Sequence, residues 1–136
     1  MATIHRFEEL EMWKLSRSLC KELGDLIDLG LFKNNYRLIG QIEGSSGSIM
    51  DNIAEGFERG TKAEFILFLG YAKGSCGELR SQLYRSLDRQ YINQDQFETF
   101  IIMAKRISAM IQKFIEYLRK TNIKGNRHKE SQPLNP

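Results

Sequence analysis

The chain of 136 residues has almost no proline, and its two prolines, Pro133 and Pro136, both lie within the last four positions. The preceding residues therefore include none that would break a helix by removing a backbone N–H and clashing with the turn before it. Long helices are permitted throughout, and no alternating strand pattern appears. With 41% hydrophobic residues, the chain has enough apolar material for one domain around a single core.

Histidine and cysteine are equally scarce, with two of each. His5 and His128 fall outside the predicted helices, which excludes the Glu-x-x-His pairs of a di-metal bundle and a histidine haem ligand. Cys20 and Cys76 lack the C-x-x-C spacing of a metal site, so we interpret both as small buried residues without a disulfide. The sequence predicts no metal and no cofactor.

Long apolar runs are also missing. A membrane-spanning helix needs about 20 consecutive apolar residues, and no segment approaches this length. The first ten residues carry Arg6, Glu8 and Glu9 and lack the apolar core of a signal peptide. We therefore expect a cytoplasmic protein with no membrane partner.

The most informative stretch is the centre of the chain, where two helical patterns meet at Gly60. A glycine just past a helix end adopts the left-handed conformation that stops the helix. Thr61 and Glu64 then match a capping box, in which the hydroxyl accepts from the third amide and the carboxylate reaches back to the first. A connection this short forces the two helices to lie antiparallel.

Apolar residues at helical spacing predict four helices, over about residues 7–29, 34–58, 61–90 and 93–120. Gly30 ends the first helix, and Asn34 or Asn35 caps the second. A second capping box, at Asn93 and Gln96, opens the fourth. The predicted fold is all-α: an antiparallel up-down-up-down four-helix bundle over residues 1–120, with a disordered basic tail over residues 121–136.

Small polar residues fill positions 44–48, in the middle of the second predicted helix. A loop is one interpretation of this run, but Ile42 and Ile49 on either side stay in helical phase, which favours a continuous helix. Glycine inside a helix costs about 1 kcal/mol relative to alanine. We therefore predict that Gly44 and Gly47 mark a tight helix crossing.

Candidate catalytic groups are few. Asp51 and Glu55 stand one helical turn apart and could form a carboxylate pair, but Arg59 follows Glu55 by four residues and compensates its charge. The glycine-rich run at 44–48 lacks the lysine and the preceding strand of a phosphate loop. No nucleophile has a histidine nearby, so the sequence predicts no catalytic residues and no enzymatic activity.

Charge is distributed unevenly along the chain. Residues 1–58 hold 6 Lys and Arg against 10 Asp and Glu, whereas residues 59–136 hold 14 against 7. The basic second half indicates an anionic partner, although a solvated helix surface would give a similar count. The candidate nucleic-acid-binding residues are Arg80, Arg85, Arg89, Lys105, Arg106, Arg119, Lys120, Lys124, Arg127 and Lys129.

The third and fourth helices carry more apolar residues than a monomeric bundle covers, which is about three positions in seven. The residues beyond the core-facing stripe are Ile66, Leu67, Tyr71, Tyr84, Ile102, Met103, Met110 and Tyr117. Soluble monomers seldom expose large apolar patches, so we predict that these residues form the interface of a homo-oligomer. A closed ring would leave no unsatisfied end.

A set of spaced motifs spans the central helices. It consists of Ser48-Ile49-x-x-Asn52-Ile53-Ala54-Glu55-Gly56, Glu64-Phe65-x-x-Phe68-Leu69 and Ala72-Lys73-Gly74-Ser75-x-x-Glu78-Leu79-x-x-Gln82-Leu83, with Phe7-x-x-Leu10-x-x-Trp13 before it and Tyr91 after it. Over about residues 6–118 the chain resembles the 23S rRNA intervening-sequence proteins, which are small bacterial four-helix bundles. The resemblance implies a homopentameric ring and, by similarity to related retroelement accessory proteins, nucleic-acid binding.

Two functions stay open on this basis. The first is an oligomeric, non-enzymatic module that binds RNA or another nucleic acid through the basic second half. The second is a structural or protein-interaction scaffold, which is favoured by one departure: Glu43-Gly44 follows Gln41-Ile42 where relatives often carry a basic pair. Binding through phosphate contacts would show a steep salt dependence, which a scaffold would lack.

Overall fold

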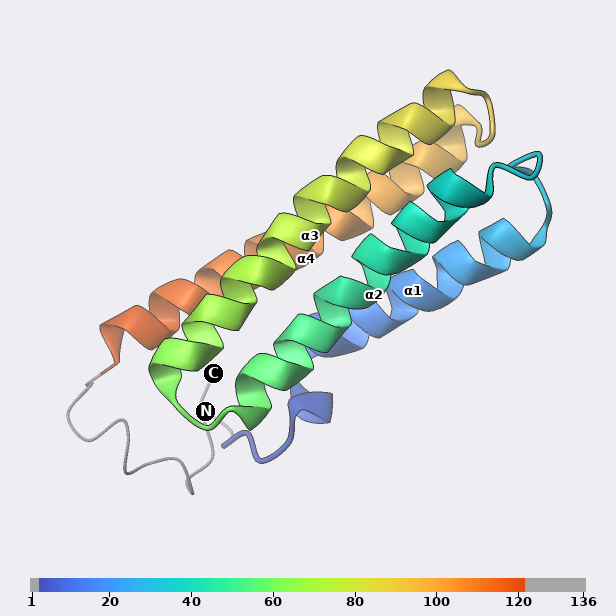
Figure 1. The fold of residues 1–136 in the computed structure, drawn as a ribbon. Coiled ribbons are helices and arrows are strands. Elements are labelled where there is room, and N and C mark those ends of the chain that lie inside the picture. The colour runs from blue at the N-terminus through green and yellow to red at the C-terminus, as the bar shows by residue number, and fades with distance from the viewer. Residues whose placement is uncertain (1–2, 122–136) are drawn as a thin grey trace.

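The computed structural model describes residues 3–121, and four long helices account for most of them (Figure 1). A short 3-10 helix, η1 (Phe7–Glu9), precedes α1 (Glu11–Asp28), α2 (Tyr36–Glu58), α3 (Lys62–Asp88) and α4 (Gln94–Lys120). No strand element occurs within residues 3–121, which confirms the all-α class. The predicted tail over residues 122–136 lies outside the described part of the chain.

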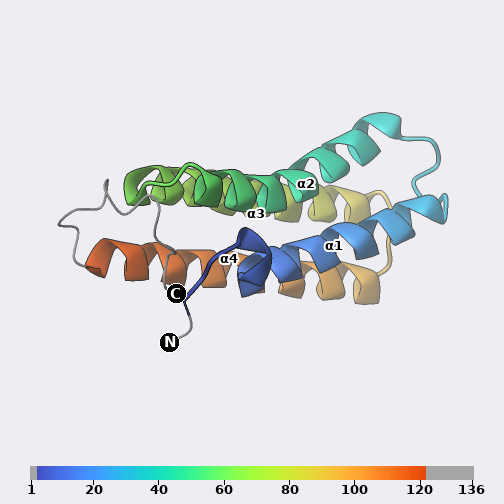
Figure 2. The ribbon, with the colours of Figure 1, turned by 90° about the horizontal axis from the view of Figure 1, so that it is seen from below.

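Contacts between α2 and α3 show that these helices run antiparallel. Ser45 in the first half of α2 bonds Gln82 near the end of α3, and Ser48 bonds Ser75 one to two turns further along. At the opposite end, Gly56 of α2 lies against α3. Figure 2 shows α2 and α3 on one side of the bundle and α1 and α4 on the other.

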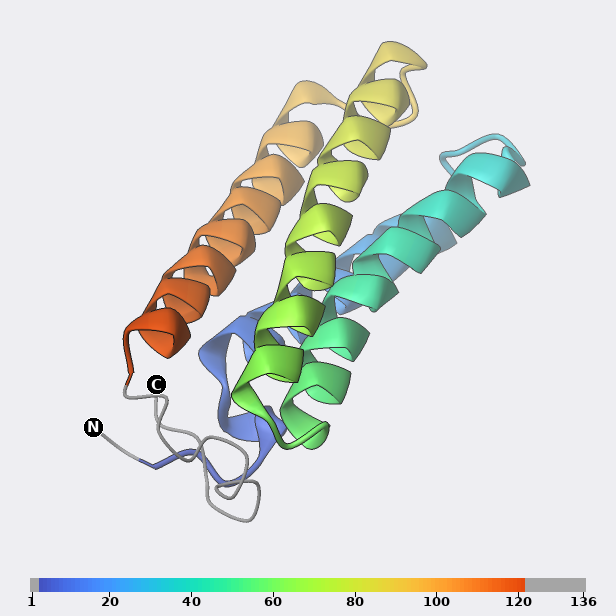
Figure 3. The same cartoon turned by 60° about the vertical axis from the view of Figure 1, so that its left-hand side comes forward.

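The pair α3 and α4 is antiparallel as well. Phe65 near the start of α3 meets Phe114 of α4 with ring centroids 5.6 Å apart, and Tyr84 near the end of α3 meets Phe97 at 4.8 Å. Helices α2, α3 and α4 therefore alternate in direction, which is compatible with the predicted up-down-up-down bundle. Figures 1 and 3 also show α2 diverging from α3 toward the connection between α1 and α2.

The predicted helix ends are confirmed at the three caps. The side chains of Asn35, Thr61 and Asn93 accept hydrogen bonds from the amides of residues 38, 64 and 96, at 3.1, 3.2 and 2.8 Å. The Gln96 side chain in turn accepts from the Asn93 amide at 2.9 Å, which completes that capping box. Gly30 and Gly60 have φ of 76° and 87°, the left-handed conformation expected of helix stops.

The start of the first helix was predicted wrongly. Phe7–Glu9 form a separate 3-10 turn, because Leu10 takes an extended conformation and points into the core with 3% of its surface exposed. The Glu9 carboxylate holds this turn by accepting from the amides of His5 and Arg6, at 2.8 and 3.4 Å. Burial of one leucine thus separates the turn from α1.

The predicted tight crossing at Gly44 and Gly47 is also wrong. α2 is continuous through both glycines, so the loop alternative is excluded, but a Cβ added at either position would meet no atom within 4 Å. The close approach is instead at Gly56, where an added Cβ would lie 2.7 Å from the Phe68 Cβ and 3.0 Å from the Phe65 Cδ1. The glycines at 44 and 47 face away from the neighbouring helices, while the serines between them face inward.

The core runs the full length of the bundle. On α3, the residues predicted to line it are at most 1% exposed: Phe65, Leu69, Ala72, Cys76, Leu79 and Leu83. Facing them on α4 are mainly isoleucines, at positions 101, 107, 111 and 115. Among the described residues, no helix is long and apolar enough to cross a membrane.

Candidate functional site

The ion pairs within residues 3–121 lie away from α4. Two are along α1, where Lys14 and Lys21 pair with carboxylates three and four residues distant. The other two join Arg59 to Glu55 and Glu64 at the turn between α2 and α3. The cations of α4 therefore have no acidic partner in the described part of the chain.

These unpaired cations form a line along one face of α4. Arg106, Lys113 and Lys120 are exposed and recur every seven residues, so they share a face and are spaced by about 10 Å along the axis. Over residues 105–120 the helix carries five cations and a single carboxylate, Glu116. We call Arg106, Lys113 and Lys120 the α4 cationic stripe. Lys113 was missed in the sequence analysis, although its seven-residue spacing is visible there.

Two arginines at the end of α3 that were predicted to bind nucleic acid contact other groups of this chain. The Arg85 guanidinium donates to the Gln41 side-chain oxygen of α2 at 2.8 Å, and so spans the diverging helices. The Arg89 guanidinium lies 5.3 Å from the ring centroid of Tyr91. Arg80 is half-buried, and its Nε has no hydrogen-bond partner among the described residues.

The other predicted basic residues divide into two groups. Lys105, Arg119 and Lys120 are exposed on α4, as a phosphate contact requires. The remaining residues lie outside the described part of the chain: Lys124, Arg127 and Lys129.

The residues predicted to form an oligomer interface are only partly exposed. Leu67, Tyr71, Tyr84 and Ile102 expose 50–63% of their surfaces, while Ile66, Met103, Met110 and Tyr117 are half-buried against the core. Tyr84 follows Tyr71 by thirteen residues, which rotates it by about 220° around the helix axis. Leu67 and Tyr71, four residues apart, share one face of α3, whereas Tyr84 lies on another, so the exposed apolar side chains of α3 form two separate small patches.

The candidate carboxylates and thiols are placed as structural groups. Glu55 of α2 lies 3.6 Å from Arg59, the compensation expected from the sequence. Burial raises the pKa of the Cys76 thiol to about 12, and burial also raises the pKa of Cys20, whose thiol donates to the Ser46 carbonyl at 3.1 Å. Both shifts disfavour the thiolate that nucleophilic chemistry needs. Within residues 3–121, no three or more His, Cys, Asp or Glu side chains converge as a metal site requires.

Fold and surface together define a small helical-bundle protein whose chief polar feature is the α4 cationic stripe. The sequence profile described as 23S rRNA-intervening sequence protein matches residues 8–113, and the chain belongs to this family. No curated protein matches the chain. The matched residues 8–113 include all the motif positions that carried the resemblance except Phe7.

A solved structure confirms the fold. A protein of unknown function from the S23 ribosomal protein family of Bacteroides thetaiotaomicron is similar to this chain with a TM-score of 0.70. The similarity covers 77% of this chain and 98% of that one, at 22% sequence identity. At this identity the likeness concerns the fold alone, and neither description names an enzymatic activity.

Proposed function

We propose that this protein is a non-enzymatic, homo-oligomeric cytoplasmic module that binds nucleic acid through the α4 cationic stripe. The observation that carries the proposal is the absence of any acidic partner for Arg106, Lys113 and Lys120 within the described residues. A cation already paired with a carboxylate exchanges one anion for another when it binds phosphate, whereas these three cations gain a partner. The stripe is free to exchange its counterions for a phosphate backbone, which is the main source of affinity in such complexes.

Binding of a fluorescently labelled single-stranded RNA, measured by anisotropy over a series of salt concentrations, tests the proposal. For single strands, each phosphate contact contributes about 0.7 to the slope of log K against log salt. The double substitution Lys113→Ala with Lys120→Ala should therefore lower the slope by about 1.4. A matched control removes Lys33 and Arg37, which are exposed on the connection between α1 and α2 and at the start of α2.

The outcomes separate the two functions left open by the sequence. A lower slope in the α4 variant alone supports nucleic-acid binding at the stripe. Absence of binding by the intact protein at low salt contradicts it and favours the scaffold, in which the charges only solvate the surface. An equal fall in both variants would show unspecific attraction to net charge.

Self-association is the second part of the proposal. Its support is the exposure of Leu67, Tyr71, Tyr84 and Ile102 at half of their surface or more. Burial of such side chains between copies would remove apolar area from water. Light scattering at micromolar concentration decides this point. A mass near five chains supports the pentameric ring, and a 15.8 kDa particle contradicts oligomerisation.

A further inference from the structure

A shallow depression lies on the outer side of α1, next to η1. It has a volume of about 480 Å³ and is lined by Glu8, Trp13, Lys14, Arg17, Ser18 and Lys21. A second depression, between α1 and α4, shares Lys14 and Ser18 with the first and adds Arg106 and Met110 of α4. The two therefore form one continuous surface from Trp13 to the end of the α4 cationic stripe. We call this surface the α1 groove.

Basic side chains dominate the polar lining of the α1 groove. Lys14, Arg17 and Lys21 are three and four residues apart, so they follow one face of α1, and Arg106 continues the line on α4. The groove contains these four cations against two carboxylates, Glu8 and Glu11. A run of cations at one-turn intervals suits an extended chain of phosphates.

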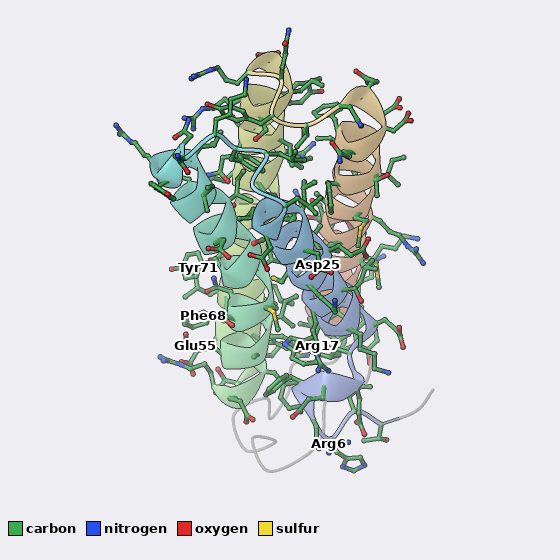
Figure 4. The ribbon with its side chains drawn as sticks, turned by 90° about the vertical axis from the view of Figure 1, so that its right-hand side faces the viewer. Arg6, Arg17, Asp25, Glu55, Phe68 and Tyr71 are labelled. Atoms are coloured by element: carbon green, nitrogen blue, oxygen red, sulfur yellow. The ribbon has the colours of Figure 1, made fainter. Side chains whose placement is uncertain are left out.

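Two of these cations form solvent-exposed ion pairs that a phosphate can replace. Lys14 bonds the Glu11 carboxylate at 3.4 Å, and Lys21 bonds Asp25 at 2.8 Å, with every one of these side chains more than half exposed. Ion pairs this exposed contribute little to stability, so a phosphate can replace the carboxylate at small cost. Arg17 has no carboxylate partner within the described residues, and Figure 4 shows it on α1 between η1 and Asp25.

An aromatic ring stands at the end of the groove. Trp13 is half-buried, with Phe7 of η1 packed edge-on at 5.2 Å and the Arg17 guanidinium 5.9 Å from its ring centroid. The 3-10 turn thus fixes the indole, while the groove leaves part of it accessible. Aromatic rings and guanidinium planes are the groups on which unpaired bases stack.

We propose that the α1 groove binds a segment of single-stranded nucleic acid, with a base stacked at Trp13 and Arg17 and phosphates at Lys14, Lys21 and Arg106. This inference rests on the proposed function and names the form of nucleic acid that the protein takes. Stacking on the Trp13 ring requires an unpaired base, because a duplex keeps its bases stacked inside. The opposite end of the α1–α4 contact is lined by Glu22 and Asp25, whose carboxylates repel phosphates. The nucleic-acid strand therefore runs from Arg106 toward Trp13, away from that end.

Trp13 is the only tryptophan of the chain, so its fluorescence reports this site alone. The intact protein is titrated at low salt with oligouridylate and with oligothymidylate of about twelve nucleotides. The expected result is saturable quenching of Trp13 by at least one of the two, reversed by added salt. Polyphosphate and polyglutamate serve as polyanions without bases and should bind more weakly, with no stacking quench.

Two variants locate the contact. Lys14→Ala with Arg17→Ala should weaken oligonucleotide binding by about tenfold or more, whereas the matched pair Lys33→Ala with Arg37→Ala should change it less than about twofold. Trp13→Leu keeps an apolar side chain against Phe7 but removes the stacking surface. Its affinity, measured by anisotropy of a labelled oligonucleotide, should fall by about tenfold to a hundredfold.

Three results would overturn the inference. Oligonucleotide binding without a change in Trp13 fluorescence, or with full affinity in the Lys14 and Arg17 variant, places the site elsewhere and leaves the α4 proposal standing. Equal or tighter binding of polyglutamate assigns the groove to an acidic protein partner. Absence of binding by any oligonucleotide contradicts both this inference and the proposed function.

Discussion

The contact of α2 with α3 differs in kind from the contact of α1 with α4. The first joins helices separated by three residues, and it contains buried polar pairs and one close backbone approach at Gly56. The second joins the first and last helices of the chain and is bordered by open depressions lined with charged side chains. One side of the bundle therefore fixes the geometry of the helices, and the other side leaves an open, charged surface.

The polar pairs explain why the α2–α3 side is the more specific of the two. Ser45 donates to the Gln82 side-chain oxygen at 2.6 Å, and both residues are buried. A shift of either helix by one residue would leave these groups without partners, which costs about 1–3 kcal/mol for each buried group. The apolar contacts elsewhere in the core specify the register less sharply, since the hydrophobic effect, unlike a hydrogen bond, has no preferred direction.

The largest expected difference between the α2–α3 side and the α1–α4 side concerns the burial of the two cysteines and its effect on stability at high pH. The Cys76 pKa is raised by burial from 9.0 to about 12, so the thiol stays protonated in the folded protein while the unfolded chain ionises. The Cys76 contribution to stability is fully present below pH 9 and is lost as pH rises from 9 to 12, by about 4 kcal/mol in all. Cys20, on the α1 side, is only half-buried.

Urea unfolding between pH 8 and 10.5 measures this contribution. The wild type should lose about 1.4 kcal/mol per pH unit above pH 9 relative to Cys76→Ala, because the contributions of all groups that the two proteins share cancel in the comparison. A thiol reagent should modify Cys20 before Cys76. Parallel stability curves for the two proteins, or simultaneous modification of the two thiols, would show that the α3 side is no more closed than the α1 side.

A substitution at Gly56 should break the close approach of α2 to α3. Gly56→Leu forces a side chain against Phe68 and Phe65, where even a Cβ lies within 3.0 Å, and we expect a loss of about 3 kcal/mol in the free energy of unfolding. Chemical denaturation measures the change. Gly44→Ala is the matched control at an open position of the same helix and should stabilise the protein by up to about 1 kcal/mol. A neutral Gly56→Leu would mean that the helices can separate without loss.

The smallest of the three effects concerns the buried pair of Ser45 and Gln82. Ser45→Ala leaves the Gln82 oxygen without its donor, so we expect a loss of about 1–2 kcal/mol. Adding Gln82→Leu to this variant should recover part of the loss, since the unpaired buried oxygen is gone. A double-mutant cycle by thermal unfolding checks the coupling, and additive single effects would show that the pair does not set the register.

Much of the fold could be predicted from local signals. Helix starts are predicted by Asn35, Thr61 and Asn93, because their side chains accept hydrogen bonds from amides of the first turn. A helix end is predicted by Gly60, because glycine adopts a positive φ without strain. The break at Leu10 could not be predicted, since it depends on a buried position that only the assembled core provides. The same holds for Gly56, whose neighbours come from α3.

The candidate site was predicted only in part. The exposure of Lys105 and Arg106 follows from their place opposite the apolar stripe of α4, which the sequence shows. The engagement of Arg85 with Gln41 does not, because the two residues are 44 positions apart. The basic face of α1 was not predicted either, because the net charge of α1 is negative. Lys14 and Arg17 nevertheless share one face of the helix.

The sequence by itself determined four helices and the ends marked by Asn35, Gly60, Thr61 and Asn93, because capping and apolar spacing act over a few residues. Tertiary structure decided which glycine meets a neighbouring helix and which cations find partners. It also decided that Arg106 of α4 joins Lys14 of α1 along one groove. These outcomes depend on distances between residues far apart in the chain, and only the packed bundle fixes those distances.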